Sequence, residues 1–592
     1  MVDTIPKRFL DQAKTRPDRP AYFVKDNGVW RATSWQGYVR EVVQAARALI
    51  ALGFQPGQRV SILGFNRPEW VILDLAAMCA GGAPAGIYTT CSAEEVQYIA
   101  HHSESPLVLV ENADQAKKVQ SKRGELPHLK HVVAMKSATK VPDAMSWEDF
   151  LARGDATPEK EVYDRVEALR PDDLATLIYT SGTTGPPKAV MLSHENLAWT
   201  SKVLRDLNEI SHDGRVLSYL PLSHIAEQMA TIHGPITGGA AVYFAESIDK
   251  VPENLKEVRP TLFFGVPRIW EKFHSAIAGK MREATGAKAK IASWARGVGA
   301  QVSDLKNRGQ EPSGLLGMQY ALATRLVFSK LKEAVGLSEA TVLVSGAAPI
   351  SKEVVAFFAS LDLRIQEIYG QSEDSGPTSF NLKGRTKIGS VGVPLPGVEV
   401  KIADDDEILV KGPNVFLGYF KDEAATRETL DEQGYLHSGD LGKFDPEGYL
   451  HITGRKKEII ITAGGKNIAP KNIEADVKDH PLVAEAVVIG DRRKYLTLLV
   501  ALDPEATKKH MAEKGLSGAP HESAEIRAEI QKQLDRINEK YARVEQVKKF
   551  TLLARPFAID TGELTPTLKI KRNVVAKNFA TEIDAMYAGE KD

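Results

Sequence analysis

The stretch YTSGTTGPPKAVMLSH, from Tyr179 to His194, decides how the rest of the chain is interpreted. It follows LATLIY, an apolar run typical of a buried strand, and it begins with hydroxyl residues, glycines, prolines and one lysine. Glycine lets backbone N–H groups turn toward an anion, hydroxyls add donors, and lysine supplies a positive charge. The stretch predicts a phosphate-binding loop, with a solvated surface loop as the alternative.

The spacing of this loop excludes the P-loop of the NTPases, G-x-x-x-x-G-K-[ST]. Gly182 is followed three residues later by Gly185, and Ala189 stands after Lys188 where the P-loop has Ser or Thr. A polyphosphate remains the expected ligand, so other parts of the chain have to identify it.

Composition limits the classes of function. The chain has 592 residues, of which 43% are hydrophobic, and 76 Lys and Arg balance 77 Asp and Glu. Its length suggests several domains, and the lack of a basic excess argues against nucleic acid as a partner. Two cysteines, Cys79 and Cys91, cannot form a disulfide framework or a four-cysteine zinc site. They favour a reducing compartment, and we expect a cytoplasmic protein.

No segment has the pattern of a signal peptide or a membrane span. The first twenty residues contain no apolar core. The most apolar stretch, residues 70–88, contains Asp74, a glycine pair and Pro84, which predicts a buried helix followed by a short strand. Peripheral contact with a membrane stays open.

The alternation of short apolar runs and amphipathic segments predicts an α/β fold with largely parallel sheet layers. A helix is expected from the cap at Ser34 to Gly53. After about residue 395, GVEVKI, EILVKG and GYLHITG predict antiparallel strands and a small β-barrel-like part. Two further strands and a long helix, from about Ser523 through Tyr541, predict a small, mobile α+β domain. We expect domains at 1–454 and 455–592, joined at GRKKEII.

Five stretches, taken in order, resemble one family. TSGTTGPPK is the first, and YGQSE, GYLHSGDLG, GRKKEIIITAGGKN and ELTPTLKIKR follow. Together they resemble the signatures of the adenylate-forming (ANL) enzymes over nearly the whole chain. LPLSHIAEQ and VPRIWEK are similar to segments of the long-chain fatty acyl-CoA synthetases. The resemblance implies that a fatty acid reacts with ATP to give acyl-AMP and pyrophosphate, and that coenzyme A then displaces AMP.

The resemblance also assigns roles to single residues. Lys569, His224, Glu373 and Thr184 are the catalytic candidates, and Thr180 and Glu373 are the expected Mg²⁺ contacts. Tyr369 would stack on adenine, and Asp440 would accept hydrogen bonds from the ribose. The full set expected at ATP or AMP is Thr180, Ser181, Gly182, Thr183, Thr184, Gly185, Lys188, Gln366, Glu367, Tyr369, Gly370, Gln371, Ser372, Asp440, Arg455 and Lys569.

The remaining expectations concern the acyl group, coenzyme A and the hinge. His224, Gly346 and Ala347 are expected at the acyl carboxylate, and Gly464 and Gly465 along coenzyme A. Lys457 matches the hinge position of the family. The motif ELTPTLKIKR leaves Lys571 as an alternative to Lys569, and we expect only one of the two to face the site.

Two other functions stay open. A fatty acyl-AMP ligase would load a carrier protein, but such relatives carry an insertion that we do not find between Asp440 and Lys466. A non-catalytic relative would only bind acyl chains or nucleotides. The sequence leaves the preferred chain length and the oligomeric state open, a homodimer being one alternative.

Overall fold

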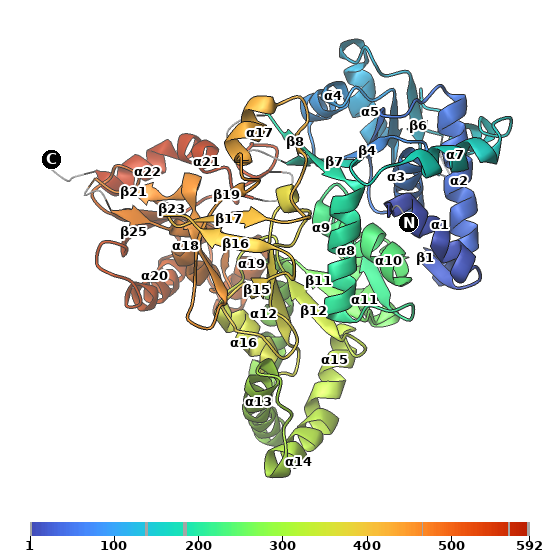
Figure 1. The fold of residues 1–592 in the computed structure, drawn as a ribbon. Helices are drawn as coiled ribbons and strands as arrows, with labels where there is room; N and C mark the ends of the chain where they lie inside the picture. Colours follow the sequence, from blue (N-terminus) through green and yellow to red (C-terminus); the bar gives the residue numbers. More distant parts are fainter. Residues whose placement is uncertain (1–2, 137–139, 181–185, 464–465, 566–568, 589–592) are drawn as a thin grey trace.

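The computed structural model describes the whole chain except residues 1–2, 137–139, 181–185, 464–465, 566–568 and 589–592. The expected α/β architecture is confirmed: the molecule contains two large sheets, a small antiparallel sheet and a C-terminal α+β unit (Figure 1).

The first large sheet has nine strands and is parallel over most of its width. Its order is β15 (Val393–Pro394), β14 (Ser379–Phe380), β13 (Ile365–Tyr369), β12 (Val342–Ser345), β11 (Leu262–Gly265), β9 (Arg215–Ser218), β10 (Ala241–Phe244), β1 (Pro20–Asp26) and β2 (Val29–Ser34). The pairs from β13 through β12, β11, β9 and β10 to β1 are parallel, whereas β2, β14 and β15 pair antiparallel.

The second large sheet has seven strands. Its order is β18 (Gly418–Tyr419), β8 (Lys188–Ser193), β7 (Leu174–Thr180), β4 (Ala83–Ile87), β3 (Arg59–Leu63), β5 (Leu107–Val110) and β6 (His131–Ala134). The antiparallel pair β7–β8 places Thr180 opposite Lys188, so the two ends of the opening loop stand side by side.

Helices cover and join these sheets. Helix α2 (Trp35–Ala51) begins as predicted at Ser34, whose side chain accepts a hydrogen bond from the N–H of Gly37. Helix α3 (Pro68–Cys79) is buried on all sides, and β4 follows it, as its apolar sequence predicted. A single apolar core joins residues of both large sheets with these two helices.

The small antiparallel sheet, with strands β16 (Glu399–Ile402), β17 (Glu407–Lys411), β19 (Leu436–Phe444) and β20 (Leu450–Arg455), corresponds to the predicted barrel-like part. Beyond it, the pair β21 (Ile460–Ile461) and β22 (Asn467–Ile468) precedes helix α18 (Pro470–Lys478). Strands β23 (Val483–Ile489), β24 (Leu496–Leu502) and β25 (Val547–Leu552) then form one sheet. The apolar cores of this C-terminal unit contain no described residue before Ile460.

One predicted boundary was wrong. Helix α20 (Ala524–Asn538) is capped by Ser523 as expected, but it ends before Tyr541. The tyrosine lies in the turn that follows and donates its hydroxyl to Asp476 at 3.1 Å. Tyr541 continues the three-to-four-residue spacing of the helix, but it lies beside the helix in the following turn.

Candidate active site

A cavity of about 1320 Å³ lies where the two large sheets, the small sheet and the C-terminal unit meet. Most of the motif residues that line it come from strand ends and loops, the usual place for a site in α/β proteins, and helices complete the wall. The predicted site residues among them are Thr180, Lys188, His224, Ala347, Glu367, Tyr369, Gly370, Gln371, Ser372, Glu373, Asp440, Arg455, Lys457 and Lys569. Positions separated by almost 400 residues in sequence are thus gathered around one space.

Some predicted residues lie elsewhere. Gln366 and Gly346 are buried and are not among the described residues that line the cavity. The amide of Gln366 instead donates to the carbonyl of Asn381 at 2.6 Å. Ser181, Gly182, Thr183, Thr184 and Gly185 of the opening loop, and Gly464 and Gly465, lie outside the described residues.

Asp440 is held by two partners. In the ladder between β19 and β20 it stands opposite Arg455, whose Nε donates to its Oδ1 at 2.8 Å. The hydroxyl of Tyr369, at the end of β13, donates to its Oδ2 at 3.0 Å. The charge of Asp440 raises the pKa of Arg455, so the guanidinium stays protonated. Each carboxylate oxygen keeps a further lone pair, which can accept a hydrogen bond from a ligand hydroxyl.

The ends of the opening loop face an aromatic residue that the sequence analysis missed. The Lys188 ammonium lies 4.7 Å from the ring centroid of Tyr419, and the hydroxyl of Tyr419 donates to Oε1 of Glu373 at 2.8 Å. Among the described residues, none donates to the other oxygen, Oε2. One oxygen of Glu373 therefore remains for a ligand. Tyr419 lies in an apolar run, NVFLGYF, that indicates only packing, so no sequence signal marked it.

Lys569 enters the cavity from the C-terminal unit. A tight turn holds its backbone: its N–H donates to Oγ1 of Thr565 at 2.9 Å, and its carbonyl accepts from the N–H of the same residue at 2.7 Å. Its side chain is exposed to the open space of the cavity, although protein groups surround that space. Desolvation by these groups lowers the pKa of Lys569, with Arg455 and Lys471 acting in the same direction and Asp440 and Glu373 opposing them. An anion bound beside Lys569 would act in the opposite direction and raise its pKa.

Lys571, the alternative lysine, does not line the cavity. It is the N-terminal cap residue of α21 (Arg572–Asn578), and its backbone N–H donates to the carbonyl of Glu563 at 2.8 Å. The two lysines therefore face different surroundings. Strand alternation does not explain this, because residues two apart in a strand share one face; the chain instead turns at Thr565 and enters α21 at Arg572.

His224 lies at the start of a short helix, α9 (Ile225–Gln228). Its Nδ1 accepts a hydrogen bond from the N–H of Ala226 at 3.2 Å, which places the ring proton on Nε2. Burial and, to a smaller extent, the positive charge of Lys569 together lower the pKa of His224 to about 4. The imidazole is therefore neutral at physiological pH and can donate from Nε2.

A buried carboxyl anchors the segment that carries His224. Glu227 accepts hydrogen bonds from Ser218 at 2.9 Å, from Thr231 at 2.7 Å and from the backbone N–H of Tyr219 at 3.1 Å. Burial raises the pKa of Glu227 to about 8. These contacts fix α9 to strand β9 and hold His224 at the cavity wall.

One part of the cavity wall is apolar. It is formed by residues of helix α8 (His194–Asn208), the π-helical turn Met229–His233 and strands β9, β11 and β12 of the nine-stranded sheet. Its lining includes Leu204, Ile210, Val216, Met229, Pro235, Ala240, Leu262, Phe264 and Val344. Such a lining suits a hydrocarbon chain, whereas the part at Asp440 and Lys569 is charged.

Backbone geometry explains two of the motif residues. A Cβ at Gly370 would lie 1.7 Å from the carbonyl oxygen of Gly376, so only glycine fits where these segments cross. Ala347 has a φ of 66°, an uncommon value for a residue with a side chain, and it lines the cavity just after β12. Glu367, in β13, accepts the N–H of Gly389 at 3.0 Å, and burial raises the pKa of its carboxyl to about 7.

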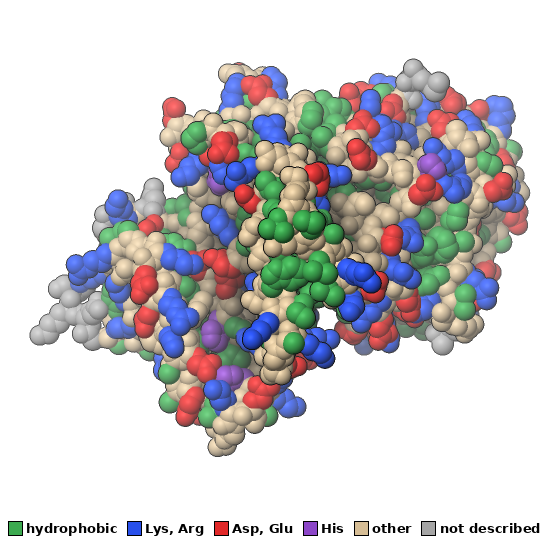
Figure 2. Space-filling model, turned by 90° about the horizontal axis from the view of Figure 1, so that it is seen from below, with side chains coloured by type: hydrophobic (Ala, Val, Ile, Leu, Met, Phe, Trp, Pro, Cys, Tyr) green, Lys and Arg blue, Asp and Glu red, His purple; other side chains and the backbone are tan. Residues whose placement is uncertain are grey.

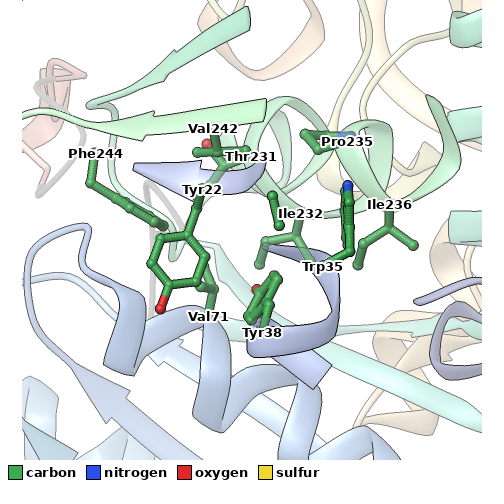
Figure 3. Close-up of a pocket in the computed structure, with 11 residues that line it drawn as sticks. Tyr22, Trp35, Tyr38, Val71, Thr231, Ile232, Pro235, Ile236, Val242 and Phe244 are labelled. Atoms are coloured by element: carbon green, nitrogen blue, oxygen red, sulfur yellow. The ribbon is translucent and has the colours of Figure 1, made fainter. Parts of the chain in front are cut away.

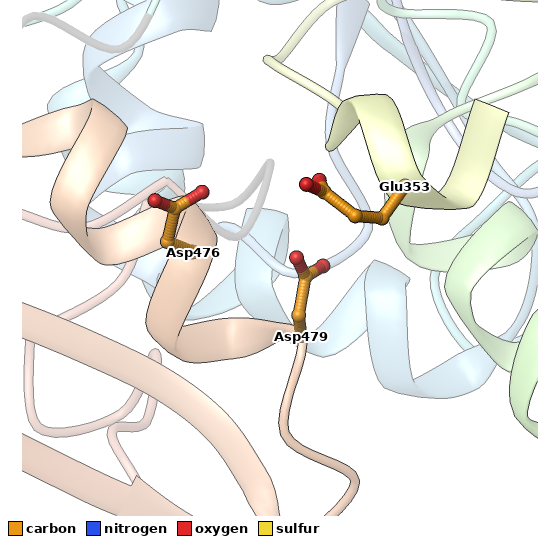
Figure 4. Close-up of side chains that lie close together, drawn as sticks. All are labelled: Glu353, Asp476 and Asp479. Carbon is orange, nitrogen blue, oxygen red and sulfur yellow. The ribbon is translucent and has the colours of Figure 1, made fainter. Parts of the chain in front are cut away.

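Two further features do not contain the motif residues. A cavity of about 10 Å³ between Tyr22, Trp35, Tyr38 and Ile232 has room for about one water molecule (Figure 3). Glu353, on α16 (Lys352–Ala359), faces Asp476 and Asp479 of the C-terminal unit, with carboxylate oxygens within 4.8 Å of one another (Figure 4). Lys540 lies 3.8 Å from Glu353 and 3.6 Å from Asp476. This acidic cluster lies across the boundary between the two parts of the chain.

Comparison with known families gives two matches. Residues 9–420 match the family of AMP-binding enzymes, and residues 457–591 match the AMP-binding enzyme C-terminal domain.

Similar proteins cover the whole chain. The long-chain-fatty-acid–CoA ligase ACSBG2 of Xenopus laevis is 39% identical over 628 residues, which span 99% of this chain and 84% of that protein. The long-chain-fatty-acid–CoA ligase FadD15 of Mycobacterium tuberculosis is 36% identical over 598 residues, spanning 99% of this chain and 98% of that protein.

Solved structures share the fold. The anthranilate CoA ligase AuaEII in complex with anthranoyl-AMP is similar with a TM-score of 0.72 and 20% identity, covering 98% of this chain and 97% of that one. ATP-bound MatB from Rhodopseudomonas palustris is similar with a TM-score of 0.70 and 23% identity, covering 98% and 99%.

Proposed function

The chain belongs to the AMP-binding enzyme family, and on that premise we propose that it is an AMP-forming ligase that joins a long-chain fatty acid to coenzyme A. The observation that carries the proposal is one cavity whose lining combines charged residues, Asp440, Glu373 and Lys569, with a group of apolar side chains. A carboxylate with a hydrocarbon tail would place its charged end beside ATP and its tail among apolar side chains.

The first half-reaction is an attack by the fatty carboxylate on the α-phosphorus of ATP, with pyrophosphate as the leaving group. Both reactants are anionic, so the protein has to offset their repulsion and hold them in line. Lys569 is proposed to neutralise the charge that develops on the α-phosphate. Neutral His224 would orient the carboxylate through Nε2–H without adding a charge of its own.

The nucleotide would be fixed at its two ends. The ribose hydroxyls would donate to Asp440, whose orientation Arg455 and Tyr369 already hold. Adenine is proposed to stack on Tyr369, and Lys188, with the loop of residues 181–185, to bind the β- and γ-phosphates.

Magnesium fits the donors that the site offers. The free Oε2 of Glu373 and the hydroxyl of Thr180 are hard oxygen ligands, which Mg²⁺ prefers alongside phosphate and water. When bound, the ion would neutralise phosphate charge. Tyr419 would hold Glu373 in place for this role.

The second half-reaction transfers the acyl group. The thiol of coenzyme A attacks the carbonyl carbon of acyl-AMP, and AMP leaves. We propose that domains 1–454 and 455–592 change their relative orientation between the two steps, with Lys457 as the pivot and Gly464 and Gly465 along the pantetheine arm. Two free, buried cysteines fit the reducing cytoplasm as the place of action.

Assay of pyrophosphate release with ATP and palmitate, with and without coenzyme A, tests the proposal. We expect sustained release only with coenzyme A, together with equal amounts of palmitoyl-CoA and AMP. A fatty acyl-AMP ligase would form acyl-AMP but no palmitoyl-CoA, and a non-catalytic relative would release no pyrophosphate.

A further inference from the structure

Exposed apolar side chains concentrate on one helical hairpin. In the part of the chain that the structure describes, eleven large hydrophobic residues are exposed, and five of them lie between residues 291 and 326. They are Ile291, on α13 (Gly286–Asn307), and Leu315, Met318, Leu322 and Leu326, on α14 (Gly314–Ala323) and the π-helical turn Thr324–Phe328. Leu315 and Met318 are 68% and 66% exposed, which is unusual for side chains of this size.

The four exposed residues of the second helix form one stripe, which we call the hairpin stripe: Leu315, Met318, Leu322 and Leu326. Their separations of three and four residues place them on one helix face. The opposite face, with Tyr320, Ala323 and Phe328, packs against α13. This helix is therefore apolar on both faces but buried on only one, and an apolar face that meets water indicates a binding partner.

Positive charge surrounds the stripe. Residues 280–335 contain ten Lys and Arg but only four Asp and Glu, although the whole chain has a net charge of −1. Arg325 lies three residues beyond Leu322, and Lys330 four beyond Leu326, so both border the stripe. Arg325, Lys330 and Lys288, near Ile291, form no ion pair with the described residues. Lys332, by contrast, is paired with Asp362 at 2.6 Å.

The shape of the region suits a flat partner. Helices α13 and α14 project away from the body of the molecule (Figure 1). Seen from that end, hydrophobic side chains gather over the middle of the face, with Lys and Arg beside them (Figure 2). No helix in the described ranges is long and apolar enough to cross a bilayer, so contact with lipid would be confined to its surface.

From these observations we propose that the hairpin stripe docks on the surface of an anionic lipid bilayer. Leu315, Met318 and Leu322 enter the boundary between headgroups and acyl chains, while Arg325 and Lys330 contact anionic headgroups. A second copy of the chain fits the stripe less well, because it would bring the same unpaired cations against one another. The stripe is separate from the cavity, so this binding goes beyond the proposed ligase activity and does not depend on it.

Flotation of the full chain with vesicles tests the proposal. We compare pure phosphatidylcholine vesicles with vesicles that contain about one-third phosphatidylglycerol. The expected result is binding to the anionic vesicles that weakens with added salt. The triple variant Leu315→Gln, Met318→Gln, Leu322→Gln should reduce the bound fraction about tenfold, because it removes the inserted apolar groups.

A matched variant controls for general loss of surface hydrophobicity. Val29, Ile248 and Val544 are also exposed, at 53%, 52% and 48%, but lie outside residues 286–335. Changing these three residues to glutamine should leave vesicle binding intact. Equal binding by the stripe variant and the wild type would overturn the proposal. So would failure of the folded wild type to bind anionic vesicles, including the case in which sedimentation shows that the stripe instead holds two copies together.

Discussion

Arg455 donates from Nε to Oδ1 of Asp440 across 2.8 Å, and strand pairing places the two residues directly opposite each other. Arg455 is the last residue of β20, immediately before the proposed hinge, and Asp440 lies in the neighbouring strand β19 of the same small antiparallel sheet. The contact that orients the proposed ribose-binding carboxylate is therefore two residues from the proposed pivot. Movement at Lys457 can occur while the ribose contact is kept.

The ribose contact can be tested with a matched pair of nucleotides. Asp440→Asn keeps the shape but removes the charge, so kcat/KM for ATP should fall about 10²-fold, or roughly 3 kcal/mol, in line with the loss of a charge-assisted hydrogen bond. With 2′,3′-dideoxy-ATP the wild type should already be impaired. With this analogue, Asp440→Asn should therefore cause little further loss of kcat/KM in steady-state kinetics. A full additional loss with the dideoxy nucleotide would argue against contact between Asp440 and the ribose.

Lys569→Ala should slow acyl-AMP formation by about 10²–10³, because the charge on the α-phosphate is no longer neutralised. Lys571→Ala is the matched control, since its side chain does not line the cavity. Pyrophosphate exchange measures this step, and supplied acyl-AMP should still be converted to acyl-CoA by both variants. The reverse pattern, with only Lys571→Ala impaired, would identify Lys571 as the catalytic lysine.

Glu373→Gln should raise the Mg²⁺ concentration that gives half-maximal adenylation by about tenfold, because a neutral amide is a weaker Mg²⁺ ligand than a carboxylate. Tyr419→Phe leaves the carboxylate in place but removes the hydrogen bond that holds it, so a smaller shift is expected. Magnesium titrations of the two variants provide the measurement. An unchanged titration of Glu373→Gln would remove this residue from the metal site.

Lys457 lies in a 3₁₀ turn, Lys456–Glu458, whose typical φ of about −60° is close to the value that proline imposes. Lys457→Pro should therefore favour the orientation seen here, in which Lys569 reaches the cavity. We expect adenylation to be retained and thioester formation to be lost in single-turnover measurements. Loss of both steps, or of neither, in a folded variant would argue against Lys457 as the pivot.

The acidic cluster between the domains predicts a pH dependence. Burial, and then Glu353 and Asp476, raise the pKa of Asp479 from 3.8 to about 6. The closed arrangement thus binds a proton more tightly than an open one, so its stability is present at low pH and falls as pH rises toward 6. X-ray scattering at pH 5 and pH 8 should show a larger closed fraction at the lower pH. Asp479→Asn should reduce the change in the ratio of closed to open molecules between pH 5 and pH 8 by about tenfold. A variant with the wild-type pH dependence would contradict this assignment.

Local sequence patterns were sufficient to predict the helices and strands that have strong signals. The cap at Ser34 and the largely apolar α3 were predicted because their signals lie within a few residues. Strand order was not, because the position of β1 beside β10 depends on contacts between residues more than 200 positions apart. The role of Tyr419 was missed for the same reason, since its partners Lys188 and Glu373 come from distant segments.

The hairpin 286–335 shows another limit. Its apolar helix predicts burial, and no sequence signal separates the face that packs on α13 from the face that meets water. Gln366 was expected at the nucleotide, yet its side-chain amide donates to the carbonyl of Asn381 instead. Motifs therefore indicated which segments meet, whereas the direction of each side chain required the structure.

Transfer of oxygen from the fatty acid to AMP tests the central claim most directly. Attack of a carboxylate oxygen on the α-phosphorus makes that oxygen the bridge of acyl-AMP, and thiolysis at the carbonyl carbon leaves it on AMP. With palmitate labelled with ¹⁸O in both carboxylate positions, mass spectrometry should find one ¹⁸O atom in each AMP and none in pyrophosphate. Unlabelled AMP, or label in orthophosphate with release of ADP, would contradict an acyl-adenylate route.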